Sequence, residues 1–319
     1  MTYKYCIIGF GIAGQILLLE MIKANVSKKD IIICDENFLG GDLITKYGSV
    51  LSNTQWWKTK KALEVYTNII PDFPLDKCTL LSDIVKACLK TALKASEGVD
   101  KLTTKVLSLE AGWNIKHTFG SFITEKVFLT IGAVEKNIDI SLPKIPLEIA
   151  LDKSQLLNHI DSDDKITVFG TSHSGTIVLD NLNQLNVPTT AIYKGSQPFV
   201  FETETYGGLK EASEISAKSI LNGEYTNIKL ISWNDTLSVY KTLIKTTKII
   251  CAIGFEPRSS FGKEFTEYNP NTAEINAGKN IYGFGIAYPG ITTIDTINYQ
   301  DVSVLSFQDQ IQRCLPACL

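Results

Sequence analysis

The sequence predicts an α/β fold that contains two strand–turn–helix units, one at the N-terminus and one near the middle of the chain. The first observation is a short apolar run that passes through spaced glycines into a helical pattern, over residues 5–19. The second is the same order of patterns over residues 165–179. This order is typical of a parallel strand that leads into a helix. The sequence therefore predicts two Rossmann-type units.

The first turn carries a complete G-x-G-x-x-G pattern, with glycines at Gly9, Gly11 and Gly14. The first glycine permits a tight turn, the second lets the backbone approach a pyrophosphate, and the third lets the helix pack closely on the sheet. The helix N-terminus then faces the phosphates. These glycines, with Ile12 and Ala13 between the last two, form a predicted dinucleotide-binding turn.

The strand that follows the first helix ends in an acidic pair. Residues 31–34 are apolar, and Asp35 and Glu36 come directly after them. An acid at this place in a Rossmann unit hydrogen-bonds the ribose hydroxyls. Asp35 is the first choice for this role and Glu36 is its neighbour. An ordinary tight turn is the alternative for the glycines alone, but the full order of strand, glycines, helix, strand and acid favours a dinucleotide site.

The second turn is a weaker version of the first, because a serine replaces the middle glycine. Its predicted binding residues are Gly170, Ser172, His173, Ser174 and Gly175. His173 could contact the phosphates or the nicotinamide side of a nucleotide, or point into solvent. A purely structural turn is the alternative for the whole segment.

The strand that accompanies the second turn ends without an acid. Residues 189–193 lead into Lys194, and Ser196 follows. Lysine and serine suit a 2′-phosphate, whereas an acid would suit a ribose diol, so the segment favours NADPH over NADH. A lysine that is merely solvated is the alternative.

Composition indicates an ordinary globular protein. The 319 residues are 44% hydrophobic and 20% charged, with 31 basic and 34 acidic side chains. Without a lysine-rich block, nucleic-acid binding is not expected. Gln15 and Glu20 interrupt the longest apolar stretch before it could span a membrane, and a cytoplasmic location is expected. The three histidines show no ligand spacing, so no metal site is expected.

Two kinds of side chain are used sparingly or unusually. Only Arg258 and Arg313 are arginines, so bidentate phosphate clamps are scarce. The seven cysteines do not form a disulfide scaffold pattern. Cys314 and Cys318 are predicted on a mobile tail, where the pair could shuttle electrons. Incidental free thiols are the alternative.

Further glycine-bearing segments follow in a fixed order. Gly40-Gly41-Asp42 comes after the first turn, the strand 126–130 ends in Ile131-Gly132, and the strand 248–251 ends in Ala252-Ile253-Gly254, before a late Gly285-Ile286. This series resembles the two-dinucleotide-binding flavoproteins, the superfamily of thioredoxin reductases, other pyridine-nucleotide oxidoreductases and flavin-containing monooxygenases. The resemblance covers nearly the whole chain.

The resemblance implies a Rossmann-type FAD domain interrupted by an inserted Rossmann-type NAD(P) domain. The FAD domain would comprise residues 1–150 and 252–319, and the NAD(P) domain residues 151–251. The implied cofactors are FAD and NADPH, with NADH as the alternative, and a homodimer is left open. FAD contacts are implied for Gly40, Gly41, Asp42, Asn53, Ile131, Gly132, Gly254, Gly285 and Ile286.

The chain departs from the thioredoxin reductase pattern and approaches the monooxygenases in part. No cysteine lies between Cys88 and Cys251, so a flavin-proximal Cys-x-x-Cys is missing. Ile286 stands where an aspartate usually follows the late glycine, and Asp295 could substitute for it. Residues 47–54 are similar to a monooxygenase stretch whose asparagine, here Asn53, lies beside the flavin and supports the oxygenated intermediate. A turn asparagine or helix cap is the alternative.

The predicted function is a redox reaction in which NADPH reduces FAD. The reduced flavin then passes electrons to oxygen or a small-molecule acceptor, with a monooxygenase as one form, and Asn53 is the one catalytic candidate. The first alternative is a flavin- or nucleotide-binding protein with little turnover, acting as a sensor or binding partner. The second is a thiol-disulfide reductase that uses Cys314 and Cys318.

Overall fold

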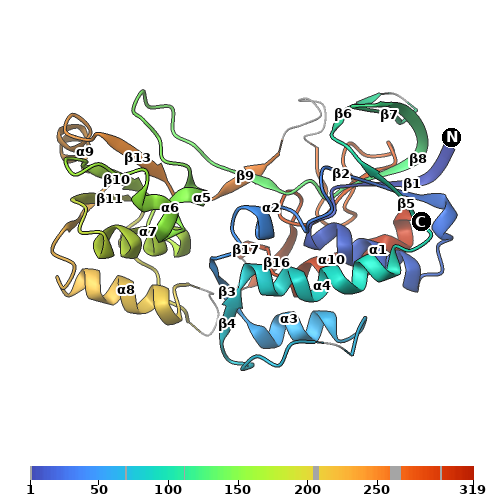
Figure 1. The fold of residues 1–319 in the computed structure, drawn as a ribbon, viewed down its shortest axis with the longest axis horizontal. Coiled ribbons are helices and arrows are strands. Elements are labelled where there is room, and N and C mark those ends of the chain that lie inside the picture. The colour runs from blue at the N-terminus through green and yellow to red at the C-terminus, as the bar shows by residue number, and fades with distance from the viewer. Residues whose placement is uncertain (1, 69, 111, 204–207, 259–266, 295–296) are drawn as a thin grey trace. The chain divides into compact units, whose positions relative to one another are not determined.

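The computed structural model describes residues 2–68, 70–110, 112–203, 208–258, 267–294 and 297–319, and it forms two compact units (Figure 1). The first unit comprises Met1–Val134 and Pro257–Leu319. The inserted unit comprises Glu135–Glu256. The predicted cofactor domains, 1–150 with 252–319 and 151–251, stay a prediction about which segment holds which ligand.

A seven-stranded sheet forms the centre of the first unit. Its central strands are almost continuously apolar, as expected of parallel strands that are covered on both faces. The strand β8 changes partner along its length, since its first half pairs antiparallel with β7 and its second half pairs parallel with β15. The order is β5 (Asp100–Thr103), β2 (Ile31–Asp35), β1 (Thr2–Ile8), β8 (Gly120–Leu129), β7 (Asn114–His117) and β6 (Val106–Glu110), with β15 (Ile281–Gly283) beside β8.

Helices and the sheet enclose the main hydrophobic core of this unit. Helix α1 (Ile12–Lys23) carries apolar residues on nearly every side, and it is buried from Ile12 to Met21. It packs against α4 (Leu81–Ala95) and α10 (Val304–Cys318), and α3 (Trp56–Leu63) packs against α10. Smaller elements complete the unit: η1 (Lys28–Asp30), α2 (Asp42–Thr45), the pair β3 (Leu51–Gln55) and β4 (Cys78–Leu80), and the pair β16 (Gly290–Ile294) and β17 (Ile297–Asp301).

The inserted unit has a four-stranded parallel sheet. Its order is β12 (Ile228–Ser232), β11 (Thr189–Tyr193), β10 (Ile166–Phe169) and β13 (Lys248–Cys251). This is the strand order of a Rossmann half, with the first strand of the unit at the centre. Its helices are α5 (Leu147–Ala150), α6 (Lys153–Leu157), α7 (His173–Gln184), α8 (Glu211–Leu221) and α9 (Thr236–Leu243).

The chain passes between the units through two short paired strands, β9 (Ala133–Glu135) and β14 (Phe255–Pro257). Each unit thus contains a set of parallel strands, which includes β1 and β2 in the first unit and all four sheet strands of the inserted unit. The carboxyl ends of these parallel strands share one edge of the sheet, and a glycine-rich turn follows one of them in each unit. Among the described residues, we find no helix with the length and apolar character needed to cross a membrane.

The prediction of a mobile C-terminal tail is wrong. Cys314 and Cys318 lie in α10, and both side chains are buried. An apolar face along this helix, which includes Ile311 and Leu315, packs into the main core. The Lys126 ammonium also donates hydrogen bonds to the carbonyls of Cys318 and Leu319, at 2.8 and 2.9 Å. The helix end is therefore fixed by both packing and hydrogen bonds.

Candidate dinucleotide-binding sites

The first turn leaves no room for side chains at two of its three glycines. Gly9 has a φ of +97°, and a Cβ there would lie 2.5 Å from the carbonyl oxygen of Thr130. A Cβ on Gly14 would lie 2.3 Å from the Gly9 oxygen and 2.8 Å from the Thr130 hydroxyl. These distances are far below contact distance, so the turn and the helix can approach β8 only with glycine at both positions.

Gly11 has a different surrounding, because the space beside it is open. A Cβ there would meet a single neighbour, the Gly40 oxygen at 3.9 Å. Gly11 is also the N-cap of α1, whose first turn offers backbone N–H groups that the helix itself does not use. Bare backbone at a helix N-terminus is the arrangement that accepts a pyrophosphate. The first turn therefore fits a dinucleotide.

Asp35 holds this turn in place. Its carboxylate accepts the N–H of Phe10, in the middle of the glycine turn, at 2.7 Å, and the N–H groups of Asn37 and Phe38 at 3.0 and 2.7 Å. A carboxylate has about four acceptor positions, so these bonds occupy most of them. Glu36 is exposed and follows directly. A ribose would thus meet a nearly saturated Asp35 and an open Glu36.

Two other predicted segments lie against the first turn. A Cβ on Gly41 would lie 3.2 Å from the Gly11 Cα, and a Cβ on Gly285 would lie 2.6 Å from the Ala13 Cβ. Gly40, Gly41 and Gly285 all have positive φ, at +96°, +74° and +84°. The structure therefore brings the loop at Gly40 and the late glycine to the turn, as the resemblance described in the sequence analysis implies.

An ion pair that the sequence did not reveal lies at the end of the same loop. The Arg258 guanidinium is 2.6 Å from the Asp42 carboxylate, and the Arg258 backbone N–H donates to the Gly132 carbonyl over 3.4 Å. The partners are separated by 216 positions, so no local pattern could indicate the pair. The rarity of arginine in this chain was the only available signal.

The second turn repeats the construction of the first. A Cβ on Gly170 would lie 2.3 Å from the Ala252 oxygen, and one on Gly175 would lie 2.2 Å from the Gly170 oxygen. The N–H of Gly170 donates to Ile192 over 2.9 Å, just as the N–H of Gly9 donates to Cys34 over 2.8 Å. The two turns are thus sterically equivalent.

Serine is accommodated without strain at the middle position of the second turn. Ser172 has φ −73° and ψ −168°, close to the −67° and −175° of Gly11. Any residue adopts this extended conformation. Since Ser172 is exposed, it adds a hydroxyl where the first turn presents bare backbone. The substitution changes the chemistry of the turn and leaves its shape unchanged.

His173 is oriented by a neighbouring helix. Its Nδ1 lies 3.1 Å from the Ser213 hydroxyl, which donates its one proton to the Lys210 carbonyl at 2.9 Å. With that proton on the Lys210 carbonyl, the hydroxyl accepts from His173, which corresponds to the ring form with a proton on Nδ1. In the neutral ring this leaves Nε2 as an acceptor, and in the charged ring Nε2 is a second donor. The ring is half-buried, and Ser213 is a site residue that the sequence did not suggest.

Trp233 is a further residue that the sequence analysis missed. It follows the carboxyl end of β12, and its backbone N–H donates to Tyr193 at the end of β11 over 2.8 Å. Its ring packs edge-on against Phe169, the last residue before the second turn, yet remains 44% exposed. A tryptophan directly after the third strand of a Rossmann unit was the signal that could have revealed it. Lys194, beyond Tyr193, is exposed.

The other predicted residues lie in the segments named for them, and their roles stay predictions. Asn53 is half-buried in β3. Ile131 and Gly132 connect β8 to β9, while the Gly254 carbonyl accepts the N–H of Lys136 at 2.9 Å. Ile286 is 38% exposed, and Ser174 lies in the first turn of α7. Asp295 lies outside the described residues.

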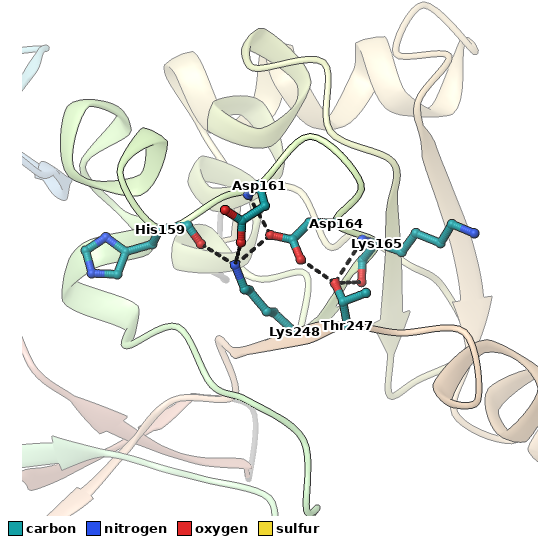
Figure 2. Close-up of polar contacts among 6 residues, drawn as sticks. All are labelled: His159, Asp161, Asp164, Lys165, Thr247 and Lys248. Atoms are coloured by element: carbon teal, nitrogen blue, oxygen red, sulfur yellow. Dashed lines mark hydrogen bonds and ion pairs between the residues drawn. The ribbon is translucent and has the colours of Figure 1, made fainter.

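Figure 2 shows a charged cluster that stabilises the inserted unit. The Lys248 ammonium contacts Asp164 at 2.7 Å, Asp161 at 2.8 Å and the His159 carbonyl at 2.9 Å. The hydrogen bonds with Asp161 and Asp164 raise the pKa of Lys248. Because Lys248 begins β13, the cluster lies at the amino ends of the strands, away from the turn. It is an ion-pair network, and the described residues contain no group of metal-ligating side chains.

Both C-terminal cysteines are shielded from solvent in this fold. Burial raises the pKa of Cys318 to about 12, and its Sγ is directed at the Cys314 carbonyl, 3.1 Å away. The Cys314 sulfur lies 3.3 Å from the Asn271 carbonyl. Thiol chemistry requires an accessible thiolate, and neither buried side chain is accessible.

Neither a protein-family model nor a curated protein matches the sequence, but solved structures match it over its full length. The bacillithiol disulfide reductase Bdr of Staphylococcus aureus shares 14% identity over 99% of this chain and 98% of its own, with a TM-score of 0.69. Thioredoxin reductase of T. acidophilum shares 13% sequence identity over 99% of this chain and 97% of its own, with a TM-score of 0.56. NADH:rubredoxin oxidoreductase of Clostridium acetobutylicum shares 15% sequence identity over 100% of this chain and 75% of its own, with a TM-score of 0.52.

At these identities the comparison establishes the fold. The chain has the architecture of these proteins, with one Rossmann-type unit inserted into another. The predicted fold class, a Rossmann-type unit interrupted by an inserted Rossmann-type unit, is therefore confirmed.

Proposed function

We propose that this protein is an FAD-dependent NAD(P)H oxidoreductase. The observation that carries the proposal is the presence of two glycine turns with the same steric construction and different polar surroundings, Asp35 beside the first and Lys194 near the second. Structures of the same fold are named as reductases of disulfides, thioredoxin and rubredoxin, which supports redox chemistry for the fold.

The first unit fits FAD. Gly11 and the N-terminus of α1 would hold the pyrophosphate, and Glu36, with the remaining acceptor position of Asp35, would hold the ribose. Gly41 forms the neighbouring wall. FAD, when bound, accepts a hydride and passes electrons on singly or in pairs. The contribution of these residues is to bind and orient the cofactor.

The inserted unit fits the reducing nucleotide. Ser172 and the N-terminus of α7 would contact the pyrophosphate, and His173, held by Ser213, would present Nε2 from the same turn. Lys194 and Ser196 are exposed beyond β11 and suit a 2′-phosphate. NADPH is therefore the preferred donor in this proposal, and NADH is the alternative that competition experiments would distinguish.

The electron acceptor is a small molecule or oxygen. Oxygen transfer supported by Asn53 stays a prediction, which labelled oxygen in a product would test. Reduction of a small disulfide is the second candidate, and the names of the structures with TM-scores of 0.69 and 0.56 favour it. Because Cys314 and Cys318 are buried, a disulfide would have to be reduced without that pair.

An anaerobic titration of the purified protein tests the proposal. Bound FAD gives a visible flavin spectrum, and addition of NADPH should bleach it in proportion to the nucleotide added. A flavin spectrum that neither NADPH nor NADH bleaches would favour the binding or sensor alternative. Protein that binds no flavin even after incubation with FAD would refute the proposal. Admission of air, with and without small disulfides, then shows which acceptor restores the spectrum.

A further inference from the structure

Arg258 links two segments that border the first dinucleotide turn. Its guanidinium contacts the Asp42 carboxylate at 2.6 Å, and its backbone N–H reaches the Gly132 carbonyl over 3.4 Å. The two side chains are partly covered, with exposed fractions of 36% for Arg258 and 31% for Asp42. One residue thus connects the loop after Gly41 with the end of the segment that follows β8.

The loop at Gly40 and Gly41 needs such a connection to keep one conformation. Both glycines have positive φ, and glycine loses more conformational freedom on ordering than any other residue. The helix that follows, α2, is only four residues long and stabilises the loop little by itself. Asp42 comes directly after the glycine pair, so fixing its carboxylate restricts both glycines.

The loop position matters because the loop forms a wall of the turn. A Cβ on Gly41 would lie 3.2 Å from the Gly11 Cα, so the two backbones are already in close approach. Gly11 is the position whose open side fits the pyrophosphate. A shift of the loop by an ångström would therefore change the space that is available to a phosphate beside Gly11.

The choice of arginine at this position is informative. Only two of the 31 basic residues are arginines, and the other, Arg313, donates to the Pro270 carbonyl from an exposed site. A guanidinium keeps its charge and directs its five donors in a fixed plane, which an ammonium on a flexible stem does not. Arg258 thus supplies an oriented contact in a chain whose basic residues, these two arginines apart, are all lysines.

We propose that Arg258 is a positioning residue that, through Asp42, holds the Gly40-Gly41 loop against the first turn and thereby sets the affinity and orientation of bound FAD. The inference rests on the proposed function, because it assigns FAD to the first unit. It adds a residue 216 positions away from its partner to the determinants of that site.

The test is a double-mutant cycle on FAD binding with the full-length protein. Arg258→Met and Asp42→Asn should each raise the FAD dissociation constant about tenfold, which corresponds to about 1.4 kcal/mol. The double variant should lose little more than either single variant, because both remove the same contact. Arg258→Lys should recover part of the affinity. Visible circular dichroism of the bound flavin, measured at saturation, should change in Arg258→Met and Asp42→Asn, and Arg313→Met is the matched control that should leave affinity and spectrum unchanged.

The outcomes separate this inference from the proposed function. Wild-type protein that binds no FAD removes both. Wild-type protein that binds FAD, with affinity and dichroism unchanged in Arg258→Met and Asp42→Asn, overturns the positioning role alone. Strictly additive losses in the double variant also overturn it, because the two residues would then act separately. If Arg258→Met does not fold, Asp42→Asn and Arg258→Lys provide the same comparison with smaller changes.

Discussion

Replacing Gly11 with alanine should weaken FAD binding without destabilising the fold. The backbone at Gly11, φ −67° and ψ −175°, is accessible to alanine, and the added Cβ would have its nearest neighbour 3.9 Å away. No native contact is therefore violated. A Gly→Ala change at such a position stabilises a protein by about 0.4–1 kcal/mol, because the unfolded chain loses conformational freedom.

The same methyl group would stand where the pyrophosphate approaches the backbone. Hydrogen bonds to a charged group contribute about 1.5–3 kcal/mol each, and the methyl should prevent about one of them. The FAD dissociation constant should then rise by about 10- to 150-fold. Flavin fluorescence during titration of the flavin-free protein measures this constant, and thermal unfolding without FAD measures the stability.

Gly14→Ala is the matched control, because its Cβ would lie 2.3 Å from the Gly9 oxygen. This variant should lose about 1–3 kcal/mol of stability or more, as overpacked sites do. The reasoning fails if Gly11→Ala binds FAD as tightly as the wild type. It also fails if Gly11→Ala unfolds as easily as Gly14→Ala, since the open space beside Gly11 would then not exist.

Three further outcomes are expected from other parts of the structure. Binding of NADPH should quench tryptophan fluorescence, because the Trp233 ring is exposed at the carboxyl ends of β11 and β12. Trp233→Phe should abolish most of this quenching. Quenching that persists in the variant would contradict the position of Trp233 beside the nucleotide. Burial alone would raise the pKa of Asp164, but hydrogen bonds from the Asp161 amide, Lys248 and Thr247 lower it below 3.8, so this contribution to stability is present above about pH 4 and is lost as the pH falls through the lowered value. The raised pKa of Lys248 means that its contribution is present below pH 10.5 and is lost as the pH rises through the raised value. Lys248→Met should cost about 1–2 kcal/mol at pH 7 and flatten the alkaline limb of a plot of unfolding free energy against pH; an unchanged plot would contradict the assignment. Replacing Cys314 and Cys318 with serine should leave any disulfide reductase activity intact and lower the melting temperature by a few degrees, because two hydroxyls enter the core; loss of activity in a folded variant would return the pair to the mechanism.

The order of strand, turn and helix patterns along the chain made the fold predictable. Contacts between residues that lie far apart in the sequence could not be predicted in this way. Gly9, Gly14, Gly170 and Gly175 could be interpreted because each lies between an adjacent strand and helix, and tight turns of this kind impose their steric limits locally. The C-terminal helix was misjudged because its burial depends on α1 and α3, which lie more than 200 residues earlier. The apolar residues of α10 already had helical spacing in the sequence, but the closely spaced Cys314 and Cys318 near the C-terminus were interpreted as a mobile tail.

In the candidate site, too, local patterns could be predicted from the sequence and contacts between distant residues could not. The backbone bonds to Asp35 depend on the path of residues 37–38, whose left-handed Phe38, with φ +53°, no propensity would suggest. Ser213 and Arg258 act through contacts across 40 and 216 positions. Pairs of this kind have no periodic signal, because only the three-dimensional arrangement brings them together.

The difference between the two turns bears on how each ligand would be held. In the first turn, Gly11 offers bare backbone. The polar contacts lie around it: Asp35 accepts the N–H of Phe10, and Asp42 pairs with Arg258 in the neighbouring loop. In the second, Ser172 is exposed at the turn itself and His173 is held there by Ser213. A ligand at the second turn can therefore hydrogen-bond side-chain groups as well as backbone, whereas a ligand beside Gly11 meets backbone alone. Under the proposed function, the two turns would thus hold their dinucleotides by different sets of groups, the first through backbone and the second through backbone together with Ser172 and His173.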